Sequence, residues 1–590
     1  MTGRFRHDPP FGARLIASDR TAFRLFAPAQ AGVAVEIEGA RPVPMRQSGD
    51  GWFEAEAACG AGARYRFRLA SGEAVTDPAS RAQAGDVHDP SIVVDPQAYE
   101  WRYPDWQGRP WHEAVLYELH VGAFGGFAGV AGKLPSLADL GVTAIELMPI
   151  ADFPGQRNWG YDGVLPFAPD AAYGTPDALK ALVDAAHERE LMIFLDVVYN
   201  HFGPEGNYLA AYAPQFFRDD IATPWGPAID FREREVRRFF TENALYWLME
   251  YRFDGLRFDA VHAISEPDWL DEMAATVHAS VERGRHVHLV LENDANVASH
   301  LRRDFDAQWN DDAHHVLHVL LTGEKEGYYE DYAEDPAGKL AKSLAEGFVY
   351  QGEPSLYRDG YPRGTTCTDL PPTAFVLFLQ NHDQIGNRPF GERLTALVDR
   401  AALEAAITLQ MLSPQIPLMF MGEEDATLTP FYFFTDYSET LAQAVREGRC
   451  REFAKFAAFA DRVRRASIPD PNAPSSFEGS VPRGNPRRAI ARRQFYQRVL
   501  AVRSAEIVPR LAGARSLKAS VLGTAAVEAT WCLSDLSVLR IAVNLGAEDV
   551  GLSTVSSGRM LFESAAGACL RARSGVLPAR SAVAFLEAHP

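Results

Sequence analysis

The pattern of apolar and polar positions changes character twice along this chain of 590 residues. Up to residue 95, short runs alternate the two kinds of residue between Gly and Pro, as in TAFRLFAP (21–28), VAVEIEG (33–39) and RYRFRL (64–69). Alternation with a period of two is typical of antiparallel strands that bury one face. We therefore expect residues 1–95 to form an N-terminal β-sandwich.

A linker bearing Pro and Trp, residues 96–110, precedes apolar runs that alternate with amphipathic helical segments, which is typical of a parallel α/β domain. Eight runs resemble buried strands: 114–122, 144–150, 192–200, 255–262, 288–294, 307–312, 375–383 and 417–424. Eight strands close a barrel, so residues 111–508 are predicted to form a (β/α)8 TIM barrel. The sixth run, AQWNDD, is short and polar and is included because of this count.

The clearest helical segment is 175–190, with Thr175 as the N-cap and Pro176 in the first turn. Its apolar stripe would pack on the outside of the barrel and consists of Leu179, Leu182, Val183 and Ala186.

The C-terminal part combines a loop, a helix and further alternating runs. The stretch 468–480 is rich in Pro and Ser and is predicted to be a loop, and 492–507 to be the last barrel helix. Alternating segments at 537–545 and 581–588 predict an antiparallel β domain, a second sandwich, over residues 509–590.

Composition narrows the class of partner. Lys and Arg number 58 against 78 Asp and Glu, a formal charge of -20, so nucleic acid and acidic membranes would be repelled and a neutral substrate is favoured. The five cysteines are scattered and lack CxxC spacing, which argues against disulfides and zinc. No signal-like segment or apolar run of about 18 residues occurs, so a cytoplasmic location is expected.

Polar residues stand at the ends of several predicted strands, where the functional groups of a parallel barrel gather. They are Asp196, Asn200, His201, Arg257, Asp259, His262, Glu292, Asn381, His382, Asp383 and Gln384. Because strand side chains alternate, Arg257 and Asp259 point the same way, and the guanidinium can keep the carboxylate ionised. A single acid at a strand end is more often structural, whereas four on one barrel favour a site.

Glycosidic cleavage needs two carboxyl groups that flank the scissile bond, one ionised and one protonated. Asp259 and Glu292 suit the roles of nucleophile and general acid/base. Adjacent strands lie about 4.8 Å apart, which is close to the carboxyl separation of about 5–5.5 Å in retaining enzymes. We therefore predict hydrolysis with retention of the anomeric configuration.

Four segments resemble, in order, the sequence regions of the α-amylase family of glycoside hydrolases: DVVYNH (196–201), GLRFDAVH (255–262), LVLENDAN (289–296) and FLQNHDQIGN (378–387). The resemblance spans roughly residues 110–510. It implies that Asp383 is a third catalytic carboxylate that holds sugar hydroxyls, with Arg257 completing the set. It further implies that His201 and His382 donate hydrogen bonds in the transition state and that Tyr161 in WGYDG is an aromatic platform below the cleaved sugar. A packed core tyrosine is the less favoured alternative for Tyr161.

The flanking segments resemble more narrowly the family members that release trehalose by hydrolysing the α-1,4 bond next to it. The expected substrate is then maltooligosyl trehalose or a related α-1,4-glucan, made by a companion synthase. The resemblance also implies that His262, Asn381 and Gln384 bind substrate. Four residues after the sixth strand would line the cleft, although on their own they could form a metal site: Asp311, Asp312, His314 and His315.

No cofactor or metal is expected. Asn200 matches a calcium ligand of many amylases, but no cluster of acidic residues accompanies it. The N-terminal sandwich is similar to the one that precedes the barrel in glycogen branching and debranching enzymes, so it could bind glucan.

Two alternative functions share these features. A branching or debranching enzyme would have the same barrel and carboxylates but would transfer the glycosyl group or cut α-1,6 bonds. A glucan-binding or scaffold protein without catalytic activity would typically lack the carboxylates, and this chain keeps all three.

Overall fold

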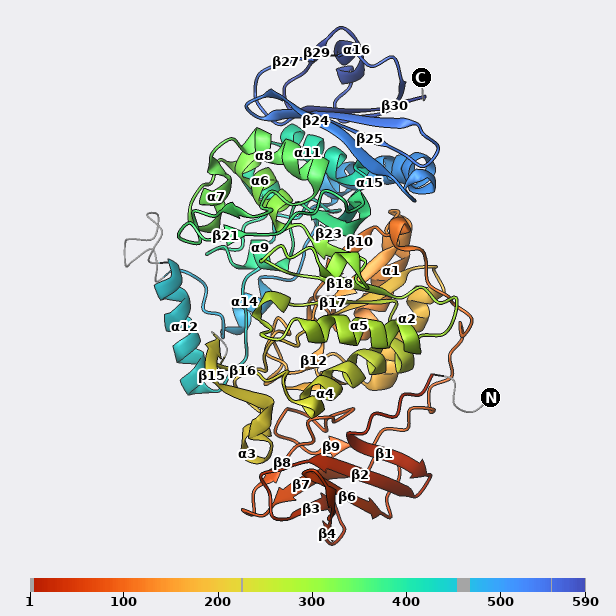
Figure 1. Cartoon of the computed structure of the whole chain (residues 1–590), viewed down its shortest axis with the longest axis vertical. Coiled ribbons are helices and arrows are strands. Elements are labelled where there is room, and N and C mark those ends of the chain that lie inside the picture. Colours follow the sequence, from red (N-terminus) through yellow and green to blue (C-terminus); the bar gives the residue numbers. More distant parts are fainter. Residues whose placement is uncertain (1–4, 224–225, 454–466, 553, 589–590) are drawn as a thin grey trace.

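The barrel lies between two β-rich regions that occupy opposite ends of the molecule (Figure 1). This arrangement comes from a computed structural model, which describes residues 5–223, 226–453, 467–552 and 554–588. The predicted class, a TIM barrel with an N-terminal β-sandwich and a C-terminal antiparallel β domain, is confirmed. The exact domain boundaries remain predictions.

Eight parallel strands close the barrel in chain order. They are β10 (Leu116–Leu119), β11 (Ala144–Leu147), β14 (Met192–Val197), β17 (Gly255–Phe258), β18 (His288–Leu291), β19 (Ala307–Trp309), β22 (Phe375–Phe378) and β23 (Ile416–Phe420). Each predicted run coincides with one of these strands, although β23 begins one residue before its run. The polar sixth run is included because its Trp309 is fully buried.

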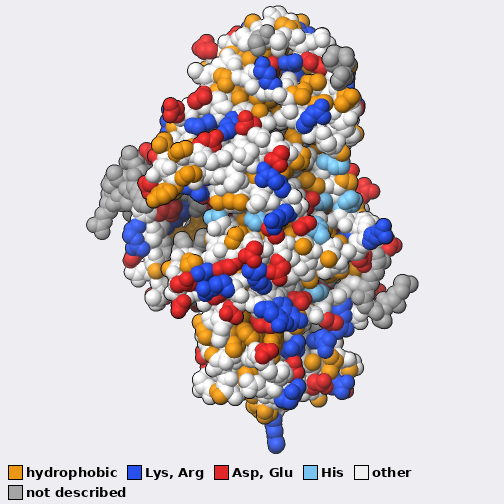
Figure 2. All heavy atoms as spheres, viewed as in Figure 1, with side chains coloured by type: hydrophobic (Ala, Val, Ile, Leu, Met, Phe, Trp, Pro, Cys, Tyr) orange, Lys and Arg blue, Asp and Glu red, His pale blue; other side chains and the backbone are white. Residues whose placement is uncertain are grey.

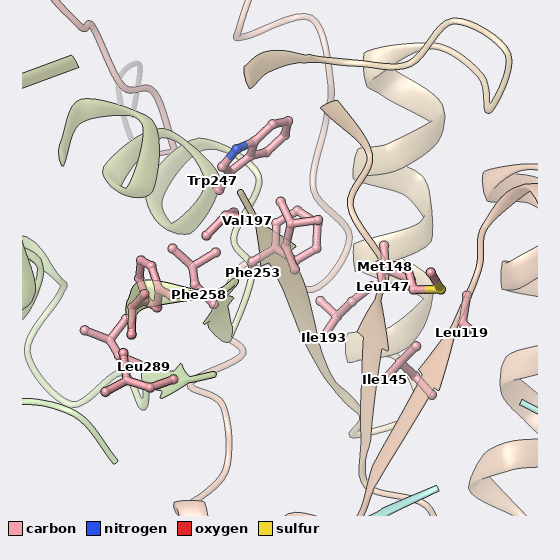
Figure 3. Packing of buried hydrophobic residues seen from close by; sticks show 14 of the residues in the cluster. Leu119, Ile145, Leu147, Met148, Ile193, Val197, Trp247, Phe253, Phe258 and Leu289 are labelled. Carbon is pink, nitrogen blue, oxygen red and sulfur yellow. The ribbon is translucent and has the colours of Figure 1, made fainter. Parts of the chain in front are cut away.

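Strand alternation separates the interior of the barrel from its helix-facing side. One buried cluster fills the interior and includes Leu116, Ala144, Met192, Phe194, Val290, Ala307, Val376, Phe378, Ile416 and Leu418. Figure 3 shows side chains of the opposite parity, such as Ile145, Ile193 and Leu289, in the layer between strands and helices. Along the same strands the interior parity continues into Glu118, Glu146, Asp196, Arg257 and Glu292. The alternation that packs the interior therefore also brings these charged groups to one end of the barrel.

Helices surround the strands. They include α1 (Phe127–Ala138), α2 (Pro176–His187), α4 (Arg234–Leu245), α5 (Asp268–Ser280), α6 (Asp311–Thr322), α8 (Pro336–Glu346), α11 (Arg400–Leu412) and α15 (Pro486–Val502). The expected N-cap of α2 is confirmed, because Thr175 Oγ1 accepts a hydrogen bond from the Ala178 N–H at 3.1 Å. The four residues of its predicted apolar stripe are buried.

Two C-terminal predictions need correction. The stretch 468–480 is not entirely a loop, because it contains α14 (Pro474–Glu478), which begins at a proline in its first turn. The helix predicted at 492–507 starts earlier, at Pro486, where the Asn485 side chain caps the N–H of Arg487, and it continues as a π-helical turn, Arg503–Ile507. A further helix, α12 (Glu439–Phe453), precedes both.

The N-terminal region consists of two packed antiparallel sheets, β1-β2-β6-β5 and β4-β3-β7-β8 with β9. Their strands are β1 (Gly12–Ala17), β2 (Arg20–Phe26), β3 (Val33–Ile37), β4 (Val43–Pro44), β5 (Arg46–Gly49), β6 (Trp52–Ala57), β7 (Arg64–Leu69), β8 (Ala74–Val75) and β9 (Ser91–Ile92). Phe11 meets Phe239 of α4 edge to face at 5.2 Å. The buried Glu250 lies 3.5 Å from Arg81 and 3.7 Å from Lys180. The sandwich and the barrel therefore share one apolar core.

The predicted linker is fixed to the barrel rather than loosely suspended. Buried Asp184 of α2 accepts hydrogen bonds from the Tyr99 hydroxyl, from the backbone N–H and side chain of Arg102, and from the N–H of Tyr103, all at 3.0 Å. Trp106 Nε1 donates to Asp254 Oδ1 at 2.9 Å. These bonds hold the linker against the helices.

The C-terminal region is a five-stranded antiparallel sheet, β24-β25-β26-β30-β28, with a two-stranded sheet β27-β29. The strands are β24 (Arg515–Gly523), β25 (Ala526–Cys532), β26 (Val538–Asn544), β27 (Val550–Gly551), β28 (Arg559–Glu563), β29 (Val576–Leu577) and β30 (Ser581–Glu587). The large sheet packs on α8 and α11, and α16 (Ala568–Arg573) covers part of it.

Two features concern the expected acidic surface and the expected lack of a membrane-spanning segment. Among the described residues on the face in Figure 2, acidic and basic side chains are interspersed. Of the helices in the described part of the chain, none combines the length and apolar composition that crossing a bilayer requires.

Arg503 offers a test of how the last helix is held to the barrel. Its fully buried guanidinium donates to the carbonyl oxygens of Met411, Ser413 and Gln415 at 2.7–3.0 Å. Arg503→Met should leave these acceptors unsatisfied and cost about 3 kcal/mol. The midpoint of thermal unfolding should fall by several degrees, whereas Arg498→Met, at an exposed position of the same helix, should change it little. Equal midpoints for both variants would contradict this role.

Candidate active site

The two predicted catalytic carboxylates lie side by side at the carboxyl ends of β17 and β18. Phe258 pairs with Leu291, so the residues that follow, Asp259 and Glu292, leave the sheet at the same level. Backbone bonds continue the pairing, because the N–H of Glu292 donates to the Phe258 oxygen at 3.0 Å and that of Val261 to the Glu292 oxygen at 3.0 Å.

Arg257 joins three carboxylates at the centre of the site. Its Nη1 donates to Asp196 Oδ2 at 2.7 Å and to Asp259 Oδ1 at 2.9 Å, and its Nη2 lies 2.9 Å from Glu292 Oε2. The guanidinium is 1% exposed and stacks over the ring of Trp309 at 4.2 Å. A planar, permanently charged fork can orient both reactive carboxyl groups at once.

The backbone at Ala260 also positions the second carboxyl group. Ala260 has φ 41° and ψ 47°, in the left-handed region that a non-glycine residue adopts only when its surroundings enforce it. In this conformation its N–H donates to Glu292 Oε2 at 2.8 Å. The turn after Asp259 thus holds the carboxyl group of Glu292.

Asn200 holds Asp259 by two hydrogen bonds. Its Nδ2 donates to Asp259 Oδ2 at 2.8 Å and to the Asp259 backbone oxygen at 2.9 Å. Its Oδ1 lies 2.5 Å from His201 Nδ1, and His201 Nε2 lies 2.9 Å from the Tyr161 oxygen. These contacts fix Asp259 and the His201 ring together.

Tyr161 lies on the floor of the site. Its hydroxyl donates to Asp196 Oδ2 at 2.6 Å, and its ring stacks on His382 with centroids 4.9 Å apart. Burial raises the pKa of Asp196 to about 7; Arg257 opposes this change and the negative charge of Asp259 adds to it. At neutral pH the Asp196 carboxyl group is therefore only partly ionised, and it neutralises only part of the positive charge of Arg257.

Glu118 is a site residue that the sequence analysis did not select. One carboxylate oxygen contacts His382 Nδ1 and the other accepts the His382 backbone N–H at 3.0 Å. Burial by itself would lower the pKa of His382, but the charge and hydrogen bond of Glu118 outweigh it and raise that pKa. An acid inside the apolar run LYEL was the signal that could have identified it.

Asp383 belongs to the short helix α9 (His382–Gly386), which Asn381 caps through a bond from the Gln384 N–H at 2.8 Å. Its Oδ1 accepts a hydrogen bond from Asn387 Nδ2 at 2.5 Å. Burial raises the pKa of Asp383, the neighbouring His382 opposes the change, and the charge of Glu292 adds to it.

A cavity of about 490 Å³ opens above these groups. Seven of the predicted site residues line it: Tyr161, His201, Asp259, His262, Glu292, His382 and Asp383. Asp259 and Glu292 therefore face a common space, as a retaining mechanism requires.

Part of the cavity wall comes from α12, which the sequence analysis did not connect with the site. Arg449 and Glu452 of this helix line the cavity. Arg449 Nη2 donates to the Gly386 oxygen at 2.6 Å, and its Nη1 donates to Asn387 Oδ1 at 3.1 Å. The sequence of this polar helix contains no pattern that would have predicted a place beside the cavity.

The four residues predicted after the sixth strand are absent from the described lining of this cavity. Asp312 is fully buried and accepts hydrogen bonds from Asn296, Tyr332, Arg363 and the backbone of 349–350, so the structure places it in a structural network instead. His314 is also buried, with its Nδ1 2.9 Å from His315 Nδ1.

The other members of the group lie nearer the site. His315 stacks on Tyr328, whose hydroxyl donates to Gln384 Oε1 at 2.9 Å. Burial raises the pKa of Asp311 well above its usual value, and the charges of Glu292, Asp294 and Asp383 add to this. Within the described ranges, no three His, Cys, Asp or Glu side chains are grouped to hold a metal ion.

Paired carboxyl groups on one guanidinium, at the open end of a TIM barrel, define a glycoside hydrolase of the α-amylase type. Consistent with this, the family described as alpha amylase, catalytic domain, matches residues 89–220, and a domain of unknown function (DUF3459) matches 514–584.

Three similar proteins narrow the class. Malto-oligosyltrehalose trehalohydrolase of Deinococcus radiodurans is 43% identical, covering 80% of this chain and 79% of its own. That of Saccharolobus solfataricus is 42% identical, over 75% and 80%. A putative alpha amylase from Salmonella typhimurium of known structure is 43% identical, covers 98% of this chain and 100% of its own, and superposes with a TM-score of 0.92. The chain belongs to the malto-oligosyltrehalose trehalohydrolases of the α-amylase family.

The contact between Glu118 and His382 predicts a change in pH dependence. Glu118→Gln should lower the pKa of His382, so its doubly protonated ring, which donates to the sugar, is lost at lower pH. The alkaline limb of the kcat/KM profile for glucan hydrolysis should then move to lower pH by about one unit. The other charged groups that act on His382, namely Asp383 and Arg257, remain in place.

The double variant Glu118→Gln/His382→Gln separates this effect from simple disruption. It should lack the shift relative to His382→Gln alone, because no imidazole remains to titrate. An unchanged alkaline limb in Glu118→Gln would refute the coupling.

Proposed function

We propose that this protein hydrolyses the α-1,4-glucosidic bond next to the terminal trehalose of maltooligosyl trehalose and releases trehalose. The main support for this function is that Asp259 and Glu292 contact the same buried guanidinium, that of Arg257, and face the same cavity. The substrate follows from relatives named malto-oligosyltrehalose trehalohydrolase that match most of the chain. We propose in addition that a companion synthase makes this substrate and that both act in the cytoplasm.

In the first step, Asp259 attacks the anomeric carbon of the sugar that precedes trehalose. Arg257 and Asn200 hold its two carboxylate oxygens, so it is oriented before substrate enters. The bond from the anomeric carbon to the trehalose 4-oxygen breaks as Glu292 gives its proton to that oxygen. A covalent glycosyl-enzyme and free trehalose result.

In the second step, the now ionised Glu292 removes a proton from water, which attacks the same carbon and releases Asp259. Two inversions give net retention. Tyr161 stacks beneath the reacting sugar, and His201, His382 and Asp383 bind its hydroxyl groups. We propose that His262, Asn381 and Gln384 bind or support the remaining sugars, and that Asp311 and His315 complete the trehalose side.

Product analysis tests the function. Incubation with maltooligosyl trehalose should yield free trehalose and a maltooligosaccharide that first appears as the α-anomer by NMR. Transfer of the glycosyl group to another glucan, or cleavage of α-1,6 bonds without trehalose release, would show a branching or debranching activity instead. A β-anomer formed first would exclude the double displacement.

Glu292→Gln tests the acid role. Loss of the proton donor should reduce kcat by about 10²–10⁴-fold with an unchanged unfolding midpoint. The loss should be much smaller on an α-glycosyl fluoride, because fluoride departs without a proton. Asp259→Asn provides the matched control, since a missing nucleophile should abolish turnover of both substrates. Equal loss on both substrates in Glu292→Gln would contradict the assignment.

A further inference from the structure

A second cavity, of about 440 Å³, lies apart from the active site. Its walls come from the short helix α10 (Leu394–Leu397), from α11 and α15, and from the segment that follows β23. Three of its nine lining residues in the described chain are arginines, namely Arg400, Arg488 and Arg492, and none is acidic. The lining is therefore positive, and Arg488 and Arg492 carry this charge because Arg400 is paired with Glu404.

Arg492 carries the argument, because its side chain is largely buried while its guanidinium forms no ion pair within the described part of the chain. It is only 5% exposed, and among the described residues no hydrogen bond or ion pair engages its guanidinium. None of its nitrogens is among the described buried polar atoms that lack a partner, so they reach the solvent of the cavity and can bind an anion there. The cavity beside it is where a missing partner would lie.

Neighbouring acids do not fill this role. Glu404 is paired with Arg400 at 2.8 Å, and Asp425 is paired with Arg493. Arg492 does act on Glu423, but burial raises the pKa of that carboxyl to about 7, so it carries only part of a charge at neutral pH.

The other walls add selectivity. Thr395 offers a hydroxyl group, whereas Val398, Leu403 and Leu428 are apolar. In TIM barrels, the loops after the seventh and eighth strands frequently form a phosphate-binding site, and these walls follow β22 and β23, the seventh and eighth strands here. Arginine forks match the geometry of phosphate oxygens.

We propose that this cavity binds a small organic phosphate monoester, with its phosphate on Arg492 and Arg488 and its organic part against the apolar wall. This site goes beyond the proposed hydrolysis and does not depend on it. The volume suits a molecule of the size of a hexose monophosphate.

Calorimetric titration at constant ionic strength tests the proposal with three probes: inorganic phosphate, glucose 6-phosphate and glucose. We expect saturable one-to-one binding of both phosphates, tighter for glucose 6-phosphate, and no binding of glucose at this site. Arg492→Gln and Arg488→Gln should each weaken phosphate binding by about tenfold or more. Arg487→Gln, an exposed neighbour on α15 outside the cavity lining, should leave it unchanged.

Thermal unfolding in phosphate-free buffer separates a ligand site from a structural role. Arg492→Gln should unfold at the same temperature as the parent protein or a higher one, because the guanidinium bonds no described group of the protein, and phosphate should no longer raise that temperature. A marked fall in its unfolding temperature, absence of saturable phosphate binding, or full binding in Arg492→Gln would overturn the proposal. Arg488→Gln, at an exposed position, is a second variant whose unfolding temperature phosphate should raise less than that of the parent protein.

Discussion

The contacts of Arg257 organise the active site, because one guanidinium meets Asp196, Asp259 and Glu292 in the barrel interior. Three carboxylates so close together would repel one another strongly at low dielectric. The cation permits them to coexist, and the ring of Trp309 beneath it prevents the fork from turning. The reactive geometry is thus built before a substrate arrives, which is the condition under which electrostatic stabilisation is most effective.

This arrangement follows from the packing of the barrel. The positions that fill the lower interior, such as Leu116 and Phe194, and those that carry charge, such as Glu118 and Asp196, lie on the same strands two residues apart. A shift of one residue in any strand would exchange interior and exterior side chains. Core packing and site geometry therefore constrain each other.

Much of this was predictable from the sequence because it depends on local pattern. The eight strands and the cap at Thr175 follow from apolar runs and capping residues, and the positions of Asp259 and Glu292 follow from strand ends. What could not be predicted depends on contacts between distant segments. The family resemblance placed Asp312 in the cleft, but its side chain bonds Arg363 and Tyr332, which lie further along the chain. The contribution of Arg449 likewise depends on how α12 packs against α9, which lies more than fifty residues earlier in the chain.

The junction between the N-terminal sandwich and the barrel has a consequence for evolution of the chain. Glu250 is a barrel residue with no exposed surface, and one of its cationic partners, Arg81, belongs to the preceding region. Deletion of the first hundred residues would strip Phe239 of an aromatic neighbour and leave that acid short of positive charge. The N-terminal sandwich is consequently not an independent domain that can be exchanged without changes in the barrel. The two parts must evolve together.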